Sequence, residues 1–227
     1  MTGKLYIVST PIGNLKDISL RAIETLNEVD FILCEDTRVT TILLKHYNII
    51  KQLISFNAIS ETIKIPTIIE RLNLGQSYAL VSDSGTPAIS DPGIRLISEA
   101  IKNNIEVSPV PGATALIAAL TISGLPTDSF VFEGFLPQKK GRQKKLQKLS
   151  EEDRTIVLYE SSHRIEKLVN ELVTYFPSRY VVISRELTKK FEESWRGFPA
   201  ELKEKMNEKT IKGEFVVVIA NKEWKSF

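Results

Sequence analysis

Short apolar segments alternate with segments of helical periodicity along the first half of the chain, and this alternation constrains the fold most strongly. We predict strands at residues 4–9, 30–34, 78–82 and 105–110, and helices at residues 20–29, 39–47, 60–72, 91–103 and 112–123. Ser19 stands at the N-cap position of the first helix, and Pro66 is expected to kink or restart the third. Strands separated by helices of this length indicate a mostly parallel sheet that is covered on both faces.

The pattern changes near residue 125, where two prolines, two glycines and three phenylalanines fall within LPTDSFVFEGFLPQKKG. Beyond this segment we predict a basic helix, further helices at residues 164–175 and 200–208, and strands at residues 155–160, 179–185 and 214–220. We therefore place a domain boundary near Phe132. It separates an N-terminal α/β domain, residues 1–132, from a smaller C-terminal α/β domain, residues 133–227, with a basic arm at 138–148.

The composition, with 42% hydrophobic and 26% charged residues, is that of an ordinary globular protein. Cys34 is the single cysteine, so an intrachain disulfide is impossible, which fits a reducing cytosol. The N-terminal residues lack the pattern of a signal peptide. The longest apolar run, Ala113–Ile122, is far shorter than the roughly 20 residues of a membrane span. We expect a soluble, cytoplasmic protein.

A block without acidic residues runs from Gly134 to Ser150. Its six cations are Lys139, Lys140, Arg142, Lys144, Lys145 and Lys148. Such a block is either one solvated face of a helix or an arm that binds phosphates.

Four loops follow predicted strands of the first domain, at the sheet edge where open α/β sheets bind ligands. They are STPIGN at Ser9–Asn14, EDTR at Glu35–Arg38, VSDSGTPAISDPG at Val81–Gly93, and VPGATAL at Val110–Leu116. Pro11 and Gly13 favour a tight turn, and Gly13 permits close approach of a ligand.

The acidic residues in these loops differ in the roles that their positions allow. Asp36 or Thr37 caps the following helix, or the EDTR loop faces a substrate. Asp91 and Pro92 have the pattern of an N-cap followed by the first helical residue. Asp83, directly at a strand end, is the best candidate to accept hydrogen bonds from ribose hydroxyls or an amine.

Several other chemistries are excluded by the motifs that the chain lacks. It has no G-x-G-x-x-G fingerprint, no P-loop and no G-x-S-x-G elbow. Its two histidines, His46 and His163, are far apart, so metal-ligand spacing is absent and we predict no metal. The residues alone therefore indicate a two-domain α/β protein with a nucleotide-like pocket formed by Gly/Pro loops.

The ordered motifs of the chain resemble those of the tetrapyrrole methylase superfamily and, within it, of bacterial methyltransferases of small-subunit ribosomal RNA. The resemblance covers almost the whole chain and rests on TPIGNLKDIS (10–19), CEDTR (34–38), SDSGTPAISDPG (82–93), PVPGATA (109–115), GLPTDSFVFEGFLP (124–137), YESSHR (159–164), RELTK (185–189) and KGEF (212–215). It implies the two-domain α/β fold of this superfamily, with a mostly parallel N-terminal sheet and a mixed C-terminal sheet.

The resemblance also implies a homodimer that holds S-adenosylmethionine in the cleft between its domains and methylates the ribose 2′-hydroxyl of a cytidine at the decoding centre of 16S rRNA. The implied cofactor-binding residues are Pro11, Gly13, Asp83, Ser84, Gly85, Thr86, Thr114, Ala115, Tyr159, Glu160 and Gly213. We hypothesise that the acidic pair Glu35 and Asp36 faces the acceptor ribose. The residues expected to bind RNA are Arg38, Lys139, Lys140, Arg142, Lys144, Lys145 and Arg164.

Two alternatives remain open. A mostly apolar pocket and no basic arm would favour a small-molecule methylase acting on a tetrapyrrole-like substrate. A non-catalytic ribosome-binding relative would keep the fold without binding S-adenosylmethionine.

Overall fold

The computed structural model describes residues 2–207 and 211–225 and divides the chain into two compact units, Met1–Thr114 and Ala115–Phe227. The division lies earlier than the boundary expected near Phe132. The reason is helix α5 (Ala115–Ser123), which packs against strands β7 (Thr155–Ser161) and β10 (Glu214–Ile219) of the second unit. The predicted helix 200–208 is observed as α8 (Pro199–Met206), and Glu208 lies outside the described residues.

The first unit contains a parallel five-stranded sheet in the order β3-β2-β4-β1-β5. Its strands are β1 (Lys4–Val8), β2 (Phe31–Cys34), β3 (Gln52–Ser55), β4 (Tyr78–Leu80) and β5 (Glu106–Val110). All five carboxyl ends therefore lie at one edge of the sheet, which confirms the predicted parallel arrangement and brings the predicted loops to that edge.

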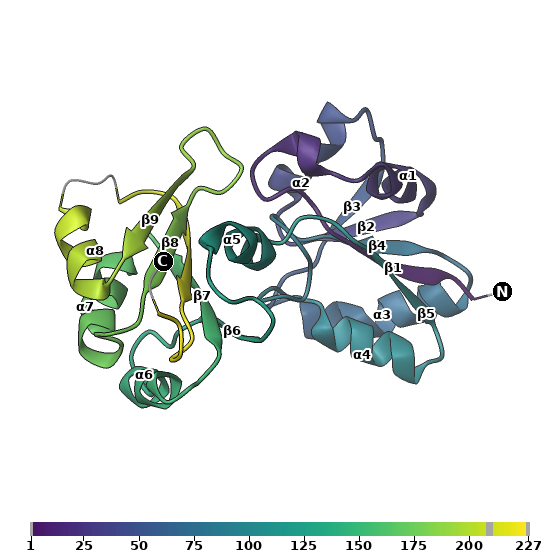
Figure 1. The fold of residues 1–227 in the computed structure, drawn as a ribbon. Coiled ribbons are helices and arrows are strands. Elements are labelled where there is room, and N and C mark those ends of the chain that lie inside the picture. Colours follow the sequence, from purple (N-terminus) through teal and green to yellow (C-terminus); the bar gives the residue numbers. More distant parts are fainter. Residues whose placement is uncertain (1, 208–210, 226–227) are drawn as a thin grey trace. The chain divides into compact units, whose positions relative to one another are not determined.

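Helices cover both faces of this sheet (Figure 1). On one face lie α1 (Leu20–Glu28) and α2 (Thr37–His46), and on the other α3 (Glu61–Asn73) and α4 (Ile94–Lys102), while a 3₁₀ helix, η1 (Leu15–Asp17), precedes α1. Each face has its own apolar core, with Leu26 and Leu44 in one and Leu72 and Leu96 in the other. Ser19 caps α1, because its side chain accepts a hydrogen bond from the Ala22 N–H.

Two features of the first unit differ from the predictions. Strand β3 was missed because this edge strand is four residues long and only partly buried, so it has no clear apolar pattern. Helix α3 continues through Pro66 and does not restart there. Pro66 has no N–H to donate to the Thr62 carbonyl, but Thr62 and Pro66 are both exposed, so water can hydrogen-bond this carbonyl instead.

The second unit contains a mixed five-stranded sheet in the order β6-β7-β10-β8-β9. Strands β6 (Phe130–Phe135) and β7 pair in parallel, whereas the pairs β7–β10, β10–β8 (Val181–Arg185) and β8–β9 (Glu193–Gly197) are antiparallel. A bulge between Phe132 and Gly134 interrupts the pairing of β6 with β7. The short and largely polar β9, at a sheet edge, was not predicted from its sequence ESWRG.

The helices of the second unit lie on both faces of its sheet (Figure 1). Helix α5 covers one face, and α6 (Arg142–Ser150), α7 (Ile165–Tyr175) and α8 cover the other. One apolar core joins these three helices to the sheet. It contains Leu146 of α6, Leu168 of α7 and Leu202 of α8, together with Leu158 and Val217 of the sheet. Among the described residues, no helix is both long and apolar enough to cross a membrane.

Candidate functional site

The loops that follow β1, β4 and β5 are joined by hydrogen bonds at the carboxyl edge of the first sheet. Thr10, directly after β1, donates from its backbone N–H to the Gly85 carbonyl at 2.9 Å. Its hydroxyl donates to the Ser82 carbonyl at 3.1 Å, and the Ser82 hydroxyl lies 3.0 Å from the Gly85 carbonyl. Both hydroxyl-bearing side chains are buried, so these bonds hold the start of the loop after β4 against the loop after β1.

Thr86 joins the third loop to the first two. Its hydroxyl lies 2.9 Å from the Ser9 hydroxyl, 2.6 Å from the Thr114 hydroxyl and 3.1 Å from the Ala113 carbonyl. Thr86 and Thr114, predicted to bind a cofactor, therefore lie side by side together with Ser9, which was not predicted. The small-residue sequence of these loops lets three backbones approach one another.

Two glycines are required for this close approach. A Cβ added to Gly112 would lie 2.9 Å from the Ser9 Cβ, and one added to Gly85 would lie 3.2 Å from the Ile12 side chain. Gly85 also has φ of +82°, a conformation that L side chains rarely adopt. Of the two residues predicted in the first loop, Pro11 is buried and Gly13 is exposed.

The rest of the loop after β4 has an unusual backbone conformation. Ala88 and Ser90 both have φ of 66°, in the left-handed region that non-glycine residues rarely occupy. Such conformations cost free energy and are concentrated in binding loops. The N-cap of α4 is Gly93 and not Asp91, so the predicted capping role of Asp91 is wrong.

A second group of polar residues follows β2 and β3 beside this loop. The Asp83 carboxylate, after β4, accepts a hydrogen bond from the Asp36 N–H, after β2, at 3.1 Å. These residues line a cavity of 520 Å³ together with Glu35, Thr37, Arg38, Ser55, Asn57, Ala58 and Ile59. The contribution of residues 55–59 was missed because β3 itself was missed.

The carboxylates at this cavity differ in pKa. Both Asp36 oxygens accept hydrogen bonds from the Arg38 side chain, which lowers the pKa of Asp36 to about 2. Partial burial raises the pKa of Glu35, and the charges of Asp83 and Asp36 raise it further. Burial likewise raises the pKa of Asp91 to about 6, with further contributions from Glu35 and Asp83. Asp36 also caps α2, because its side chain accepts a hydrogen bond from the Arg38 N–H.

Tyr159 lies at the N-terminus of α5 within the second unit. Its hydroxyl accepts a hydrogen bond from the Leu116 N–H at 3.2 Å, next to Ala115, another predicted cofactor residue. The Tyr159 ring packs against Phe132 and Phe135, with ring centroids 4.9 and 5.7 Å apart. The tyrosine is therefore fixed in place by β6 on one side and by the first turn of α5 on the other.

Glu160 occupies a different environment from its neighbour. Its side chain is 0% exposed and pairs with Arg164 at 2.9 Å and with Arg142 at 3.5 Å. Glu160, predicted to contact the cofactor, and Arg142, predicted to bind RNA, therefore already have ion-pair partners within the protein. Both side chains are buried, and Arg142 is additionally paired with Glu171 at 2.7 Å.

Gly213, also predicted to line the cofactor site, is packed against Glu186. It has φ of +99°, and an added Cβ would lie 2.4 Å from a Glu186 carboxylate oxygen. That carboxylate accepts hydrogen bonds from the Glu214 N–H and the Lys189 side chain, each at 3.0 Å. The glycine thus makes room for an ordered carboxylate between β8 and β10.

The predicted basic arm is not a uniformly exposed surface. Lys139, Lys140, Lys144 and Lys148 are exposed, whereas Lys145 pairs with Glu133 at 2.5 Å. Arg142 is buried, as described above. The exposed lysines lie in the turn before α6 and along this helix.

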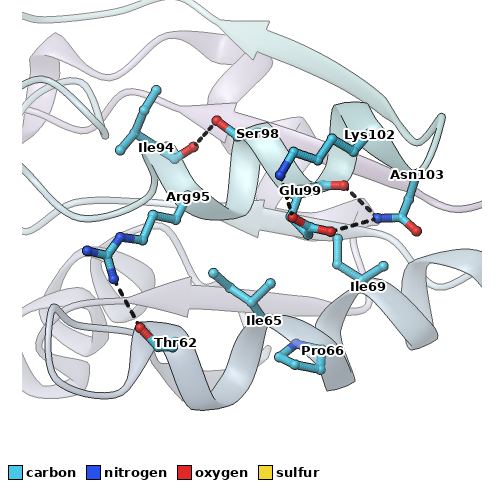
Figure 2. Close-up of a pocket in the computed structure, with 10 residues that line it drawn as sticks. All are labelled: Thr62, Ile65, Pro66, Ile69, Ile94, Arg95, Ser98, Glu99, Lys102 and Asn103. Carbon is cyan, nitrogen blue, oxygen red and sulfur yellow. Dashed lines mark hydrogen bonds and ion pairs between the residues drawn. The ribbon is translucent and has the colours of Figure 1, made fainter.

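A further groove, of 590 Å³, lies between α3 and α4 (Figure 2). Its polar side chains pair with one another: Arg95 donates to Thr62 at 3.1 Å, and Lys102 pairs with Glu99 at 3.2 Å. None of the predicted site residues lines this groove. In the described part of the chain, no cluster of histidine, cysteine or acidic residues could hold a metal ion.

The sequence and fold of the chain match those of a known family of proteins. The family of tetrapyrrole (corrin/porphyrin) methylases matches residues 4–203. The chain therefore belongs to this family of methyltransferases. The fold agrees, since the chain superposes on a cobalt precorrin-4 methyltransferase of cobalamin biosynthesis with a TM-score of 0.71 at 20% identity, covering 96% of this chain and 94% of that one.

The chain is also similar in sequence to relatives named as ribosomal RNA methyltransferases. "Ribosomal RNA small subunit methyltransferase I" of Synechocystis sp. is 50% identical over 96% of this chain and 79% of its own length. The protein of the same name from Thermotoga maritima is 46% identical over 97% of this chain and 100% of its own length. A uroporphyrin-III C-methyltransferase from Thermus thermophilus, solved with S-adenosylhomocysteine, has a TM-score of 0.67 at 16% identity, over 96% of this chain and 97% of that one. These relatives confirm the family resemblance of the sequence motifs.

Proposed function

We propose that this protein uses S-adenosylmethionine to methylate the RNA of the small ribosomal subunit, at the ribose 2′-hydroxyl of a cytidine in the decoding centre. The observation that supports this most directly is the 46–50% identity, over almost the whole chain, to the relatives named as ribosomal RNA small subunit methyltransferases. The exposed lysines before and along α6 support an RNA substrate. We also expect a homodimer that acts on small subunits in the cytoplasm.

The three joined loops of the first unit suit the cofactor. Gly85 and Gly112 let the three loops pack closely at this edge, and we expect the backbone groups gathered there to contact the cofactor. Pro11, Gly13, Asp83, Ser84, Thr86 and Thr114 complete the set that we expect to contact it. In the second unit the expected contacts are Ala115, Tyr159 and Gly213. When bound, S-adenosylmethionine supplies an electrophilic methyl group on a positively charged sulfur.

On the acceptor side, we assign the general base to Glu35. A base works best when its pKa lies near the working pH, and the pKa of Glu35 is raised whereas that of Asp36 is lowered to about 2. With the methyl donor held by the three loops, the Glu35 carboxylate would accept the proton of the acceptor hydroxyl as that oxygen takes the methyl group. Asp36 and Asp83 hold the loop that presents Glu35, through the hydrogen bond between them.

The test is methyl transfer from labelled S-adenosylmethionine to unmethylated 30S subunits, followed by mapping of the modified nucleotide. We expect one ribose-methylated cytidine in 16S rRNA. Transfer to a tetrapyrrole but not to 30S subunits would favour the small-molecule alternative. Binding of 30S subunits with no binding of S-adenosylmethionine in calorimetry would identify a non-catalytic ribosome-binding protein.

A further inference from the structure

The ion-pair network around Glu160 is buried and is not explained by the reaction described above. Its side-chain exposures are 0% for Glu160, 3% for Arg142, 17% for Glu171 and 22% for Arg164. Two carboxylates and two guanidinium groups make the cluster electrically balanced. Burying such charges costs free energy even when they are paired, so stability alone is a poor reason for the network.

Both arginines also reach the same short stretch of backbone. Arg164 donates to the Leu136 carbonyl and Arg142 to the Pro137 carbonyl, each at 3.2 Å. These carbonyls are consecutive and lie directly after β6. A neutral side chain at position 160 would leave both guanidinium groups without their shared partner.

The turn that begins at these carbonyls presents two exposed lysines. It runs through Lys139 and Lys140 to Gly141, whose φ of +85° sets the start of α6. The turn closes with a hydrogen bond from the Arg142 N–H to the Lys139 carbonyl at 3.3 Å. Arg142 therefore anchors the turn at both ends, once through its side chain and once through its backbone.

We propose that Glu160 is a positioning residue for RNA binding, which acts through Arg142 and Arg164 to hold Lys139 and Lys140 in one geometry before the RNA arrives. The inference rests on the proposed function, because it assumes that these lysines contact RNA phosphates. Binding through flexible lysines loses conformational entropy, so a turn that is ordered beforehand increases affinity. Glu160 then contacts neither cofactor nor RNA.

The test is a double-mutant cycle on binding to unmethylated 30S subunits. Glu160→Gln keeps the shape of the side chain but removes its charge, and we expect the Kd for 30S subunits to rise about tenfold at low salt. In a Lys139→Ala/Lys140→Ala background the same change should have less than about a twofold effect, because its action passes through these lysines. In steady-state methylation, the KM for 30S subunits should rise more than kcat falls.

Arg164→Lys is a second variant, should Glu160→Gln fail to fold. A lysine cannot pair with Glu160 and donate to the Leu136 carbonyl in the fork geometry of a guanidinium. It should therefore weaken 30S binding only while Lys139 and Lys140 are present. Equal effects with and without the two lysines would overturn the proposal, as would a loss of S-adenosylmethionine affinity in Glu160→Gln with 30S binding retained. The binding cycle does not depend on methyl transfer. A wild-type protein that binds 30S subunits without methylating them would therefore refute the proposed function but not the role of Glu160 in binding.

Discussion

Glu35 and Asp36 are adjacent in sequence, but their surroundings shift their pKa values in opposite directions. Arg38 pairs with Asp36, while Glu35 lies beside the negative charges of Asp36 and Asp83. Environments that separate the pKa values of two neighbouring acids are typical of a division into a base and an orienting group. We therefore expect Glu35 to act as the base of the proposed reaction, while Asp36 caps the start of α2.

Replacing Glu35 tests its assignment as the base. Glu35→Gln should slow single-turnover methylation of 30S subunits roughly 10²-fold, because general bases contribute about 10²–10⁴-fold. Asp36→Asn is the matched control, since asparagine also caps a helix, and its rate should change by less than about tenfold. Rates are measured by rapid mixing with labelled cofactor. Full activity of Glu35→Gln would contradict the assignment.

Asp91 should make stability depend on pH. Its pKa is 3.8 in the unfolded chain and about 6 in the folded protein, so the unfolded chain releases the proton first. Burial of the ionised carboxylate then lowers the free energy of unfolding as the pH rises from about 4 to about 6, and the loss persists above that range. Asp91 is partly exposed, so solvent screening limits the effect to about 1 kcal/mol.

The measurement compares Asp91→Asn with the wild type in urea unfolding at pH 4 and pH 7. The variant cannot ionise at this position, so its stability relative to the wild type should increase by about 1 kcal/mol between the two pH values. Asp17→Asn, at an exposed aspartate of the same unit, should show no such change. An equal pH response of both variants would refute the role of burial at Asp91.

At the level of elements, the carboxyl edge of the first sheet depends on hydroxyl groups that join three loops. Thr86, in the loop after β4, contacts Ser9 after β1 and Thr114 after β5. These three strands are neighbours in the order β4-β1-β5, so one side chain can reach both flanking loops. The arrangement keeps the loops together although their residues are far apart in sequence.

Removal of the Thr86 hydroxyl should loosen this edge. Thr86→Val keeps the shape but leaves partly buried hydrogen-bonding groups unsatisfied, so we expect a loss of about 1–3 kcal/mol in the free energy of unfolding. The affinity for S-adenosylmethionine should fall as well. Thr41→Val removes only a bond to the Thr37 carbonyl within α2 and should have little effect on either measurement. Urea unfolding and calorimetry would show whether the two variants differ.

At the level of the whole molecule, the formal net charge of +2 gives little electrostatic attraction to RNA. The local arrangement matters more, because four lysines near α6 remain exposed after Arg142 and Lys145 are engaged in ion pairs. RNA affinity should therefore depend on salt through a small number of phosphate contacts.

If each of these four lysines neutralises one phosphate, a plot of log K against log salt concentration should have a slope of about −3 to −4. Lys139→Ala/Lys140→Ala should make that slope less negative by about 1.5–2. Filter binding of 30S subunits over a KCl series measures both. Lys167→Ala/Lys203→Ala, at exposed positions of α7 and α8, is the control and should leave the slope unchanged. An unchanged slope in the Lys139→Ala/Lys140→Ala variant would contradict a role for this turn in RNA binding.

Much of the fold could be predicted because the relevant signals are local. Apolar periodicity predicted four of the five strands of the first sheet, and Ser19 was correctly identified as the cap of α1. The edge strands β3 and β9 were missed because they are short and partly exposed. Such strands have no clear apolar pattern in the sequence and form only by pairing with a neighbouring strand. The capping role predicted for Asp91 failed because φ of +130° at Gly93 begins α4 two residues later.

The sequence by itself determined the alternating α/β pattern, the family and the position of the Gly/Pro loops at strand ends. These properties depend on residues that are close in the chain or on ordered motifs. Only the tertiary structure decided which charges remain available for chemistry. Asp83 meets Asp36 across 47 residues, and Arg142 meets Glu171 across 29. Whether a charged side chain is paired, buried or exposed depends on such distant partners, so local sequence could not separate Arg142 from the lysines beside it.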